Sequence, residues 1–102
     1  MGPQNMGLKE AYLAKREAEL KEWDAQILQL EAKAEQAQAQ VKIQYFKQLE
    51  SLRTKHTTVR DKLHELKQAS GAAWETVKIG LETAWHDLKG GLTSAAAKFK
   101  YG

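Results

Sequence analysis

The sequence predicts an all-α protein, in which a long coiled-coil helix is followed by a shorter, glycine-interrupted helix that folds back into an antiparallel helical bundle. Three observations lead to this prediction. The 102-residue chain has no glycine or proline between Leu8 and Ala69. Apolar residues recur in that stretch at alternating spacings of three and four. An eleven-residue repeat fills the last third of the chain.

The positions of glycine and proline divide the chain. The predicted segments are a flexible tail at 1–7, a long coiled-coil helix at 8–69, a break at 70–71 and a shorter amphipathic helix at 72–102. A continuous helix over 8–69 would extend about 93 Å at 1.5 Å per residue. Within the last helix, Gly80, Gly90 and Gly91 each cost about 1 kcal/mol relative to alanine, so this helix needs a partner surface.

The seam of the first half runs through Leu13, Leu20, Trp23, Ile27, Leu30, Ala34, Ala37 and Val41. Arg16 holds its one polar position, where we expect the side chain to reach past the edge of the core; a register-selecting device is the alternative. Residues 31–40 are rich in alanine and glutamine and contain no turn residue. We interpret them as a closely packed part of the helix and not as a hairpin, with low-complexity disorder as the competing interpretation.

After Val41 the seam shifts by four residues and continues through Tyr45, Leu49, Leu52, His56, Val59, Leu63 and Leu66. From Leu63 onward the period becomes eleven. The first position of the repeat holds Leu63, Trp74, Trp85 and Ala96, and the fifth holds Lys67, Lys78, Lys89 and Lys100. Since eleven residues complete three turns with about 20° left over, every repeat presents the same face. The pattern predicts packing on another helix or on an interface.

The predicted contact seam consists of large apolar side chains from both helices: Leu20, Trp23, Ile27, Leu30, Leu52, Val59, Leu63, Trp74, Val77, Leu81, Trp85 and Leu88. A lone rod would leave them in water, and burying each large side chain contributes roughly 1.5–3 kcal/mol. We therefore expect a homo-oligomer.

Charge favours an antiparallel orientation of the partner. Residues 8–35 carry five basic and seven acidic side chains, whereas residues 42–69 carry seven basic and three acidic ones. Antiparallel helices bring these unlike halves together, and a parallel pair stacks like upon like. Folding of residues 72–101 onto 42–69 would give the dimer four helices at each end. A chain that stays extended through Ser70-Gly71 is the alternative.

No motif for catalysis is recognised. The sequence has no cysteine, no phosphate-binding glycine loop and no zinc-protease pattern. His56 and His64 lie eight residues apart with Arg60 between them, and a cation in that place opposes a metal. We predict a protein that is not an enzyme, with no catalytic residue, no metal and no cofactor. The basic stretch 41–60 is interpreted as a solvated face that matches an acidic helix, so nucleic acid is not an expected partner.

Attachment to an anionic membrane surface is the alternative function of the last helix. Lysines beside an apolar face that carries tryptophans are typical of helices lying on lipid. The residues concerned are Trp74, Lys78, Trp85, Lys89, Phe99 and Lys100. The apolar arc is narrow and flanked by alanine and glycine, which favours helix packing instead. No apolar run is long enough to span a bilayer, and we recognise no secretory signal; the expected location is cytoplasmic, at the membrane periphery in the alternative case.

Two stretches, EAYLAKREAELKEWDAQILQLEAKA at 10–34 and GAAWETVKIGLETAWHDLKGGLTSAAAKFK at 71–100, resemble a family of small bacterial coiled-coil proteins that includes cyanobacterial stress-response proteins. The eleven-residue repeat is also similar to those of late-embryogenesis-abundant proteins and apolipoproteins. The resemblance implies a non-enzymatic, stress-associated helical protein, and no catalytic residue carries over from it. The predicted function is thus a structural or stress-protective role through self-association in a bacterial cytoplasm; an adaptor for another coiled-coil protein is a further possibility.

Overall fold

The computed structural model describes residues 7–101, with side chains up to residue 99. These residues form three α-helices, α2 (Leu8–Glu35), α3 (Ala39–Gln68) and α4 (Gly71–Tyr101). No strand occurs in this part of the chain, so the predicted all-α class is confirmed. Apart from Gly7, the expected tail at 1–7 lies outside the described residues. Within residues 7–101, no helix combines the length and apolarity that crossing a membrane requires.

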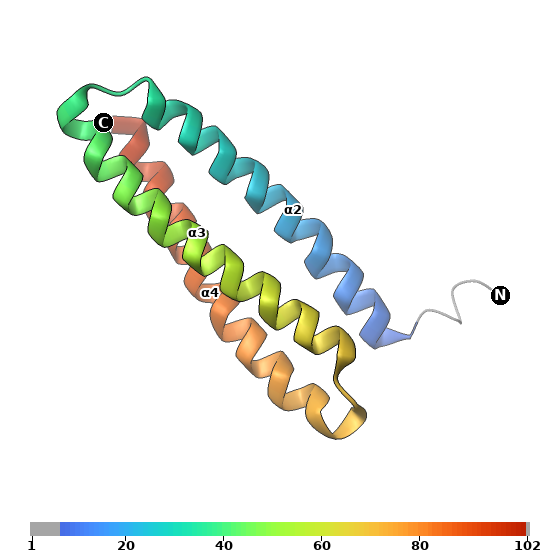
Figure 1. Cartoon of the computed structure of the whole chain (residues 1–102). Helices are drawn as coiled ribbons and strands as arrows, with labels where there is room; N and C mark the ends of the chain where they lie inside the picture. Colours follow the sequence, from blue (N-terminus) through green and yellow to red (C-terminus); the bar gives the residue numbers. More distant parts are fainter. Residues whose placement is uncertain (1–6, 102) are drawn as a thin grey trace.

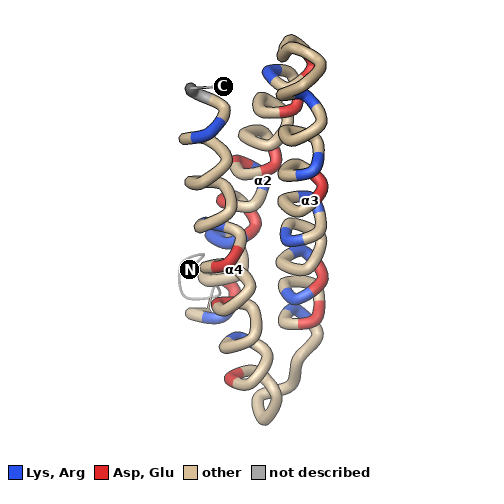
Figure 2. The backbone as a smooth tube through the Cα atoms, turned by 90° about the vertical axis from the view of Figure 1, so that its left-hand side faces the viewer, with Lys and Arg blue, Asp and Glu red and all other residues tan. Residues whose placement is uncertain are grey.

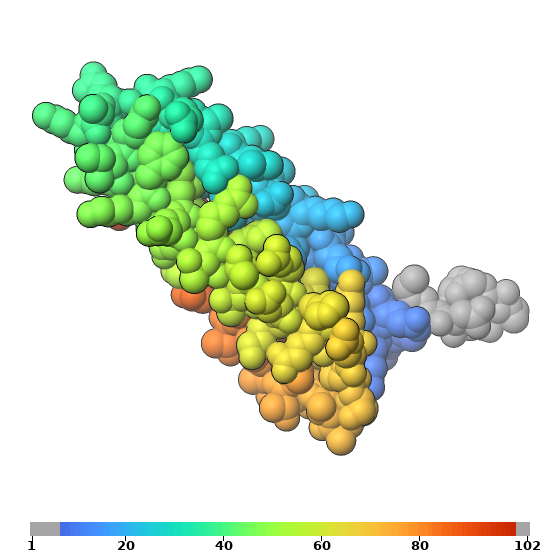
Figure 3. Space-filling view, in the orientation of Figure 1, coloured from blue at the N-terminus to red at the C-terminus, as the bar shows by residue number. Residues whose placement is uncertain are grey.

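The three helices lie side by side along the long axis of the molecule, and consecutive helices run in opposite directions (Figure 1). Arg53 of α3 bonds to Glu31 of α2, and Lys55 of α3 lies 3.6 Å from Asp87 of α4. Because α2 and α4 are both antiparallel to α3, they run parallel to each other. The molecule measures 54 × 27 × 17 Å along its principal axes. In the space-filling view, α2 and α3 flank each other along the length of the molecule (Figure 3).

The predicted long helix over 8–69 is interrupted in this structure, because α2 ends at Glu35 and α3 begins at Ala39. The backbone N–H groups of Gln36 and Ala37 bond to carbonyls three residues earlier, which tightens the end of α2. At Gln38 the backbone is extended, with φ −66° and ψ 153°. The physical reason is burial: the seam within 31–40 holds only alanines, so a turn there gives up little apolar contact. In return, the seam of α2 is buried against α3 and α4.

The last helix also differs from its prediction. α4 is continuous through all three interior glycines and, at 31 residues, is slightly longer than α2 and α3, which have 28 and 30. It begins where the Ser70 carbonyl accepts the N–H groups of Ala73 and Trp74. Seven of its apolar side chains are buried: Trp74, Leu81, Trp85, Leu88, Leu92, Ala95 and Phe99. This burial outweighs the low helix propensity of the glycines.

Candidate functional site

The predicted contact seam lies in one core that extends along all three helices. Ten of its twelve residues are buried, namely Leu20, Ile27, Leu30, Leu52, Val59, Leu63, Trp74, Leu81, Trp85 and Leu88. The other two, Trp23 and Val77, are partly buried and pack against that core. All twelve therefore contact helices of their own chain. The closed bundle does not present this seam to a partner, and the exposed rod that motivated a dimer is absent from it.

The predicted lipid-facing residues are mostly covered as well. Trp74, Trp85 and Phe99 are only 5–6% exposed. The Lys78 ammonium lies 4.9 Å from the centre of the Tyr12 ring on α2, whereas Lys89 is exposed. The Lys100 side chain lies outside the described residues. Lipid contact through this face of α4 therefore requires that α4 separate from α2 and α3.

Aromatic rings fill the space between the parallel helices α2 and α4. Trp23 of α2 and Trp85 of α4 have ring centres 4.4 Å apart at an angle of 31°. Near the start of both helices, Tyr12 meets Trp74 edge to face at 6.3 Å. Such pairs add to stability beyond the area that they bury. The aromatic layer therefore fixes the register of α2 on α4.

Arg16 joins this aromatic layer. Its guanidinium carbon lies 4.5 Å from the centre of the Trp85 ring and 5.2 Å from that of Tyr12, and Nη1 bonds to Glu19 at 3.1 Å. The Tyr12 hydroxyl donates to the Glu82 carboxylate at 3.2 Å, and burial raises the pKa of Tyr12 above its ordinary value. Instead of reaching past the edge of the core, Arg16 lies over the rings and bridges α2 and α4.

Ion pairs join α2 to α3. The Arg53 guanidinium donates two hydrogen bonds to Glu31, at 3.1 and 2.9 Å, and a third to Asp24 at 2.9 Å. The hydrogen bonds to Glu31 are the main cause of a raised pKa at Arg53. Further along, Lys67 contacts Glu17. Lys and Arg recur along α3 (Figure 2), and the charge complementarity expected between two chains operates here within one chain.

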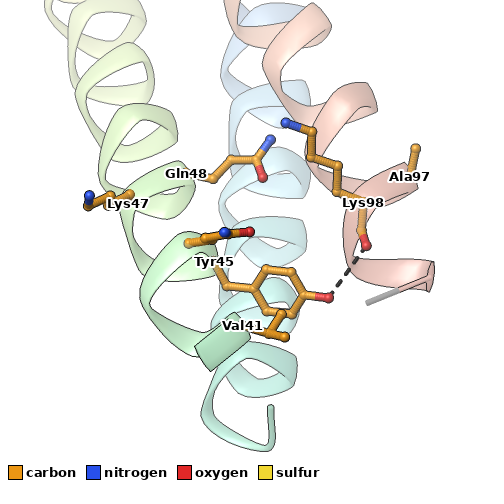
Figure 4. A pocket seen from close by; sticks show the side chains of 7 residues that line it. Val41, Tyr45, Lys47, Gln48, Ala97 and Lys98 are labelled. Carbon is orange, nitrogen blue, oxygen red and sulfur yellow. Dashed lines mark hydrogen bonds between the residues drawn. The ribbon is translucent and has the colours of Figure 1, made fainter. Parts of the chain in front are cut away.

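The contact between α3 and α4 combines a close approach at a glycine with one stacked ring pair. A Cβ atom at Gly91 would lie 2.9 Å from Cδ2 of Leu52, so the two helices approach closely at this level. Near the end of α4, the rings of Tyr45 and Phe99 stack with centres 4.0 Å apart. The Tyr45 hydroxyl donates to the Lys98 carbonyl at 3.4 Å beside an open groove of about 1000 Å³ (Figure 4). The groove is lined by Val41, Gln44, Tyr45, Lys47, Gln48, Ala97 and Lys98.

Possible metal ligands are scattered over the described residues. No group of three or more His, Cys, Asp or Glu side chains within them is placed to hold a metal ion. A smaller open cleft of about 360 Å³ between α2 and α3 contains His56 and His64 together with Glu17 and Asp24. The cations Lys21, Arg60 and Lys67 line the same cleft, and they oppose a bound cation.

Sequence reasoning missed a second stripe of apolar residues on α2. It consists of Ala11, Ala14, Ala18, Ala25, Leu28 and Ala32, all exposed, with Lys21 completing the spacing. The intervals are three and four, the same spacing as the buried seam. Leu28, the largest apolar side chain of the stripe, is 52% exposed. The spacing was present in the sequence, but alanine side chains contribute little apolar surface, so the leucines and tryptophans beside them dominated the pattern.

One strip of the outer face of α4 likewise contains no Asp, Glu, Lys or Arg. Its exposed residues include Ala72, Thr76, Ile79, Thr83, His86, Gly90, Thr93 and Ala97, again at intervals of three and four. Ile79 is 63% exposed.

A comparison with protein-family models, with curated proteins and with solved structures found no match to this chain. The family resemblance drawn from the sequence stays a prediction.

Proposed function

We propose that this chain is a non-enzymatic structural protein that acts by packing helix on helix, with a second copy of itself as its partner. The observation that supports this most is the exposed stripe of α2, defined above from Ala11 to Ala32. It has the spacing of a coiled-coil seam, yet no other helix of the chain covers it.

The composition of the stripe favours contact with another helix over contact with water. The solvent-facing side of an amphipathic helix is normally rich in charged residues. Along α2 one strip of this side carries five alanines and Leu28, and Lys21 is the one charged member of the strip, whereas Lys15, Glu22 and Lys33 lie on the exposed surface outside it. Small side chains allow two helix axes to approach closely, toward the short end of the usual 8–10 Å. The α4 face around Ile79 offers a second surface of the same kind.

Sedimentation equilibrium at micromolar concentrations tests this proposal with a matched pair of variants. Ala25→Glu places a charge in the centre of the stripe, whereas Thr57→Glu places the same charge on an exposed position of α3. We expect the unmodified chain and Thr57→Glu to associate, and Ala25→Glu to lose at least tenfold in association constant while circular dichroism shows unchanged helicity. A monomer at every concentration, or equal effects of both variants, would contradict the proposal.

Anionic vesicles form the second arm of this experiment, because they test the membrane alternative. Trp74 and Trp85 are already buried, so a blue shift of tryptophan emission does not report attachment by itself. Co-sedimentation with vesicles does. Self-association through α2 predicts that the chain stays in the supernatant. Sedimentation with vesicles, unchanged in Ala25→Glu, would favour attachment through α4 instead.

A further inference from the structure

We infer that two copies of this chain exchange their α2 helices through the turn at residues 36–38. In the resulting dimer, residues 8–68 form one continuous helix, and α2 packs against α3 and α4 of the partner. The inference rests on the proposed function only in taking a second copy as the partner. It uses the buried seam of the chain and not the exposed stripe of α2.

The turn is weakly encoded by its own residues. Gln36, Ala37 and Gln38 all have good helix propensity, and no residue in the described chain has a positive φ. Gln36 already has helical angles, with φ −89° and ψ −5°. Gln38, the N-cap of α3, makes no capping hydrogen bond with its side chain. A change of a few backbone angles at Ala37 and Gln38 therefore converts the turn into a helix.

The contacts of α2 can be re-formed without change across two chains. α2 and α3 are antiparallel, so two straightened helices that cross near residues 36–38 place each α2 on the partner's α3 in its original direction. The Trp23–Trp85 stack, the Tyr12–Glu82 hydrogen bond and the Arg53–Glu31 pair would all recur between chains. Exchange of an identical element in this way is a low-cost route to a dimer.

Charge also favours an antiparallel orientation of the two copies. α2 carries five basic and seven acidic side chains, and the 42–69 part of the chain carries seven basic and three acidic ones. The three acidic residues that bond to Arg53 or Lys67, namely Glu17, Asp24 and Glu31, all lie on α2. The antiparallel crossing brings each acidic α2 to the basic α3 of the other copy. Repulsion therefore disfavours the parallel crossing.

The exchange is expected to depend on concentration and to be slow. Straightening the turn adds helical hydrogen bonds, but the dimer gives up the proximity that joins α2 to its own α3. Buried side chains such as Leu20, Ile27 and Leu30 must leave the core before α2 can transfer. Incubation at high concentration or mild warming should therefore populate the dimer, and dilution should leave it trapped for a time.

Pulsed electron resonance distances test the exchange directly. Because the chain has no cysteine, spin labels can be placed at Gln26→Cys, which lies outside the stripe of α2, and at Thr58→Cys, both exposed positions on neighbouring helices. Doubly labelled chains are mixed with a large excess of unlabelled chains, so that only distances within one chain are measured. In the closed bundle the two labels lie on adjacent antiparallel helices, whose axes are separated by roughly 10 Å. In a continuous helix, 32 residues separate them by about 48 Å.

Three outcomes separate this inference from the proposed function. A dimer fraction that shows the distance near 50 Å supports the exchange. A dimer fraction that shows only the short distance overturns the exchange and leaves association through the outer stripe of α2. A chain that stays monomeric at every concentration overturns both.

Variants of Gln38 provide the matched control. Proline fits the φ of −66° in the turn, but within a continuous helix it removes a hydrogen bond and collides with the preceding turn. We expect Gln38→Pro to lower the dimer fraction at least about tenfold, and Gln38→Ala to leave it unchanged or raise it. If proline disturbs the closed bundle, Gln38→Gly should still lower the dimer fraction because glycine disfavours helix. Equal long-distance fractions in Gln38→Ala, Gln38→Gly and Gln38→Pro would overturn the exchange.

Discussion

α4 meets its two neighbours in different ways. Toward α2 it presents large rings, with Trp85 stacked on Trp23 and covered by Arg16. Toward α3 it presents Gly91, where an added Cβ would lie 2.9 Å from Leu52, and near its end the ring of Phe99, which stacks on Tyr45. At the level of Trp85, large side chains lie between α2 and α4, whereas at Gly91 the missing side chain lets α3 and α4 approach closely.

The difference teaches which contacts carry stability and which carry shape. The ring layer stabilises through the area that it buries and through ring geometry, so it should be most sensitive to loss of side-chain volume. The close contact at Gly91 depends on the absence of atoms, so it should be most sensitive to added volume. The contact at Trp85 should therefore be damaged most by a smaller side chain, and the contact at Gly91 by a larger one.

The largest effect is expected from loss of a ring between α2 and α4. Trp85→Ala should lower the free energy of unfolding by about 3–5 kcal/mol, because it opens a cavity beneath Trp23 and Arg16. Trp23→Ala should have a smaller effect, since Trp23 is only partly buried. Urea unfolding followed by circular dichroism measures both values. Equal losses for the two variants would show that the ring layer is not organised around Trp85.

Added volume at Gly91 tests the other side of α4. Gly91→Leu should destabilise the chain by about 1–3 kcal/mol, because the new side chain is forced against the buried Leu52. Gly90→Leu is the matched control, since no atom lies within 4 Å of a Cβ at Gly90. Thermal unfolding compares the two variants with the unmodified chain. If both variants lower the unfolding midpoint equally, the close approach of α3 and α4 does not explain the destabilisation by Gly91→Leu.

Substitution of Arg16 tests how much the cation contributes to the stability of the ring layer. Arg16→Gln should lower the free energy of unfolding by about 0.5–2 kcal/mol, because the guanidinium no longer lies over Trp85 and Tyr12. Arg16→Lys keeps the charge but loses the planar stacking, so its stability should fall between those of the unmodified chain and Arg16→Gln. Urea unfolding ranks the three chains. A lysine variant as stable as the unmodified chain would contradict the stacking account.

The smallest expected effect is a gain in stability. Gly90→Ala should raise the free energy of unfolding by about 0.5–1 kcal/mol, because alanine is the better helix former and the site is open. Gly91→Ala should gain less or lose, since its Cβ meets Leu52. The comparison uses the same urea titrations. A larger gain in stability at Gly91 than at Gly90 would contradict the close contact between Gly91 and Leu52.

Much of the core could be predicted from spacing alone. Repeated intervals of three and four identified side chains such as Ile27, Val59 and Leu88, which are fully buried. The charge difference between the two halves of the predicted long helix also reappears, as contacts of Arg53 and Lys67 with acidic residues of α2. Both signals depend only on side-chain chemistry along one face, which folding of the chain does not alter.

The topology could not be predicted in the same way. The turn at residues 36–38 contains no glycine or proline, so local propensity favours helix there. Only the gain from burying the seam of α2 within the same chain explains it, and that gain is a property of the whole bundle. The glycines of α4 misled in the opposite direction, because burial around Leu88 and Leu92 holds the helix together across Gly90 and Gly91.

Small-angle X-ray scattering on the monomer fraction tests most directly the central claim, that one chain buries its own seam by turning at residues 36–38. The account predicts a radius of gyration close to 16.4 Å for the described fold. A chain that kept residues 8–69 as one straight helix would form a rod of about 93 Å, with a radius of gyration of about 27 Å. A monomer with the larger value would contradict the account.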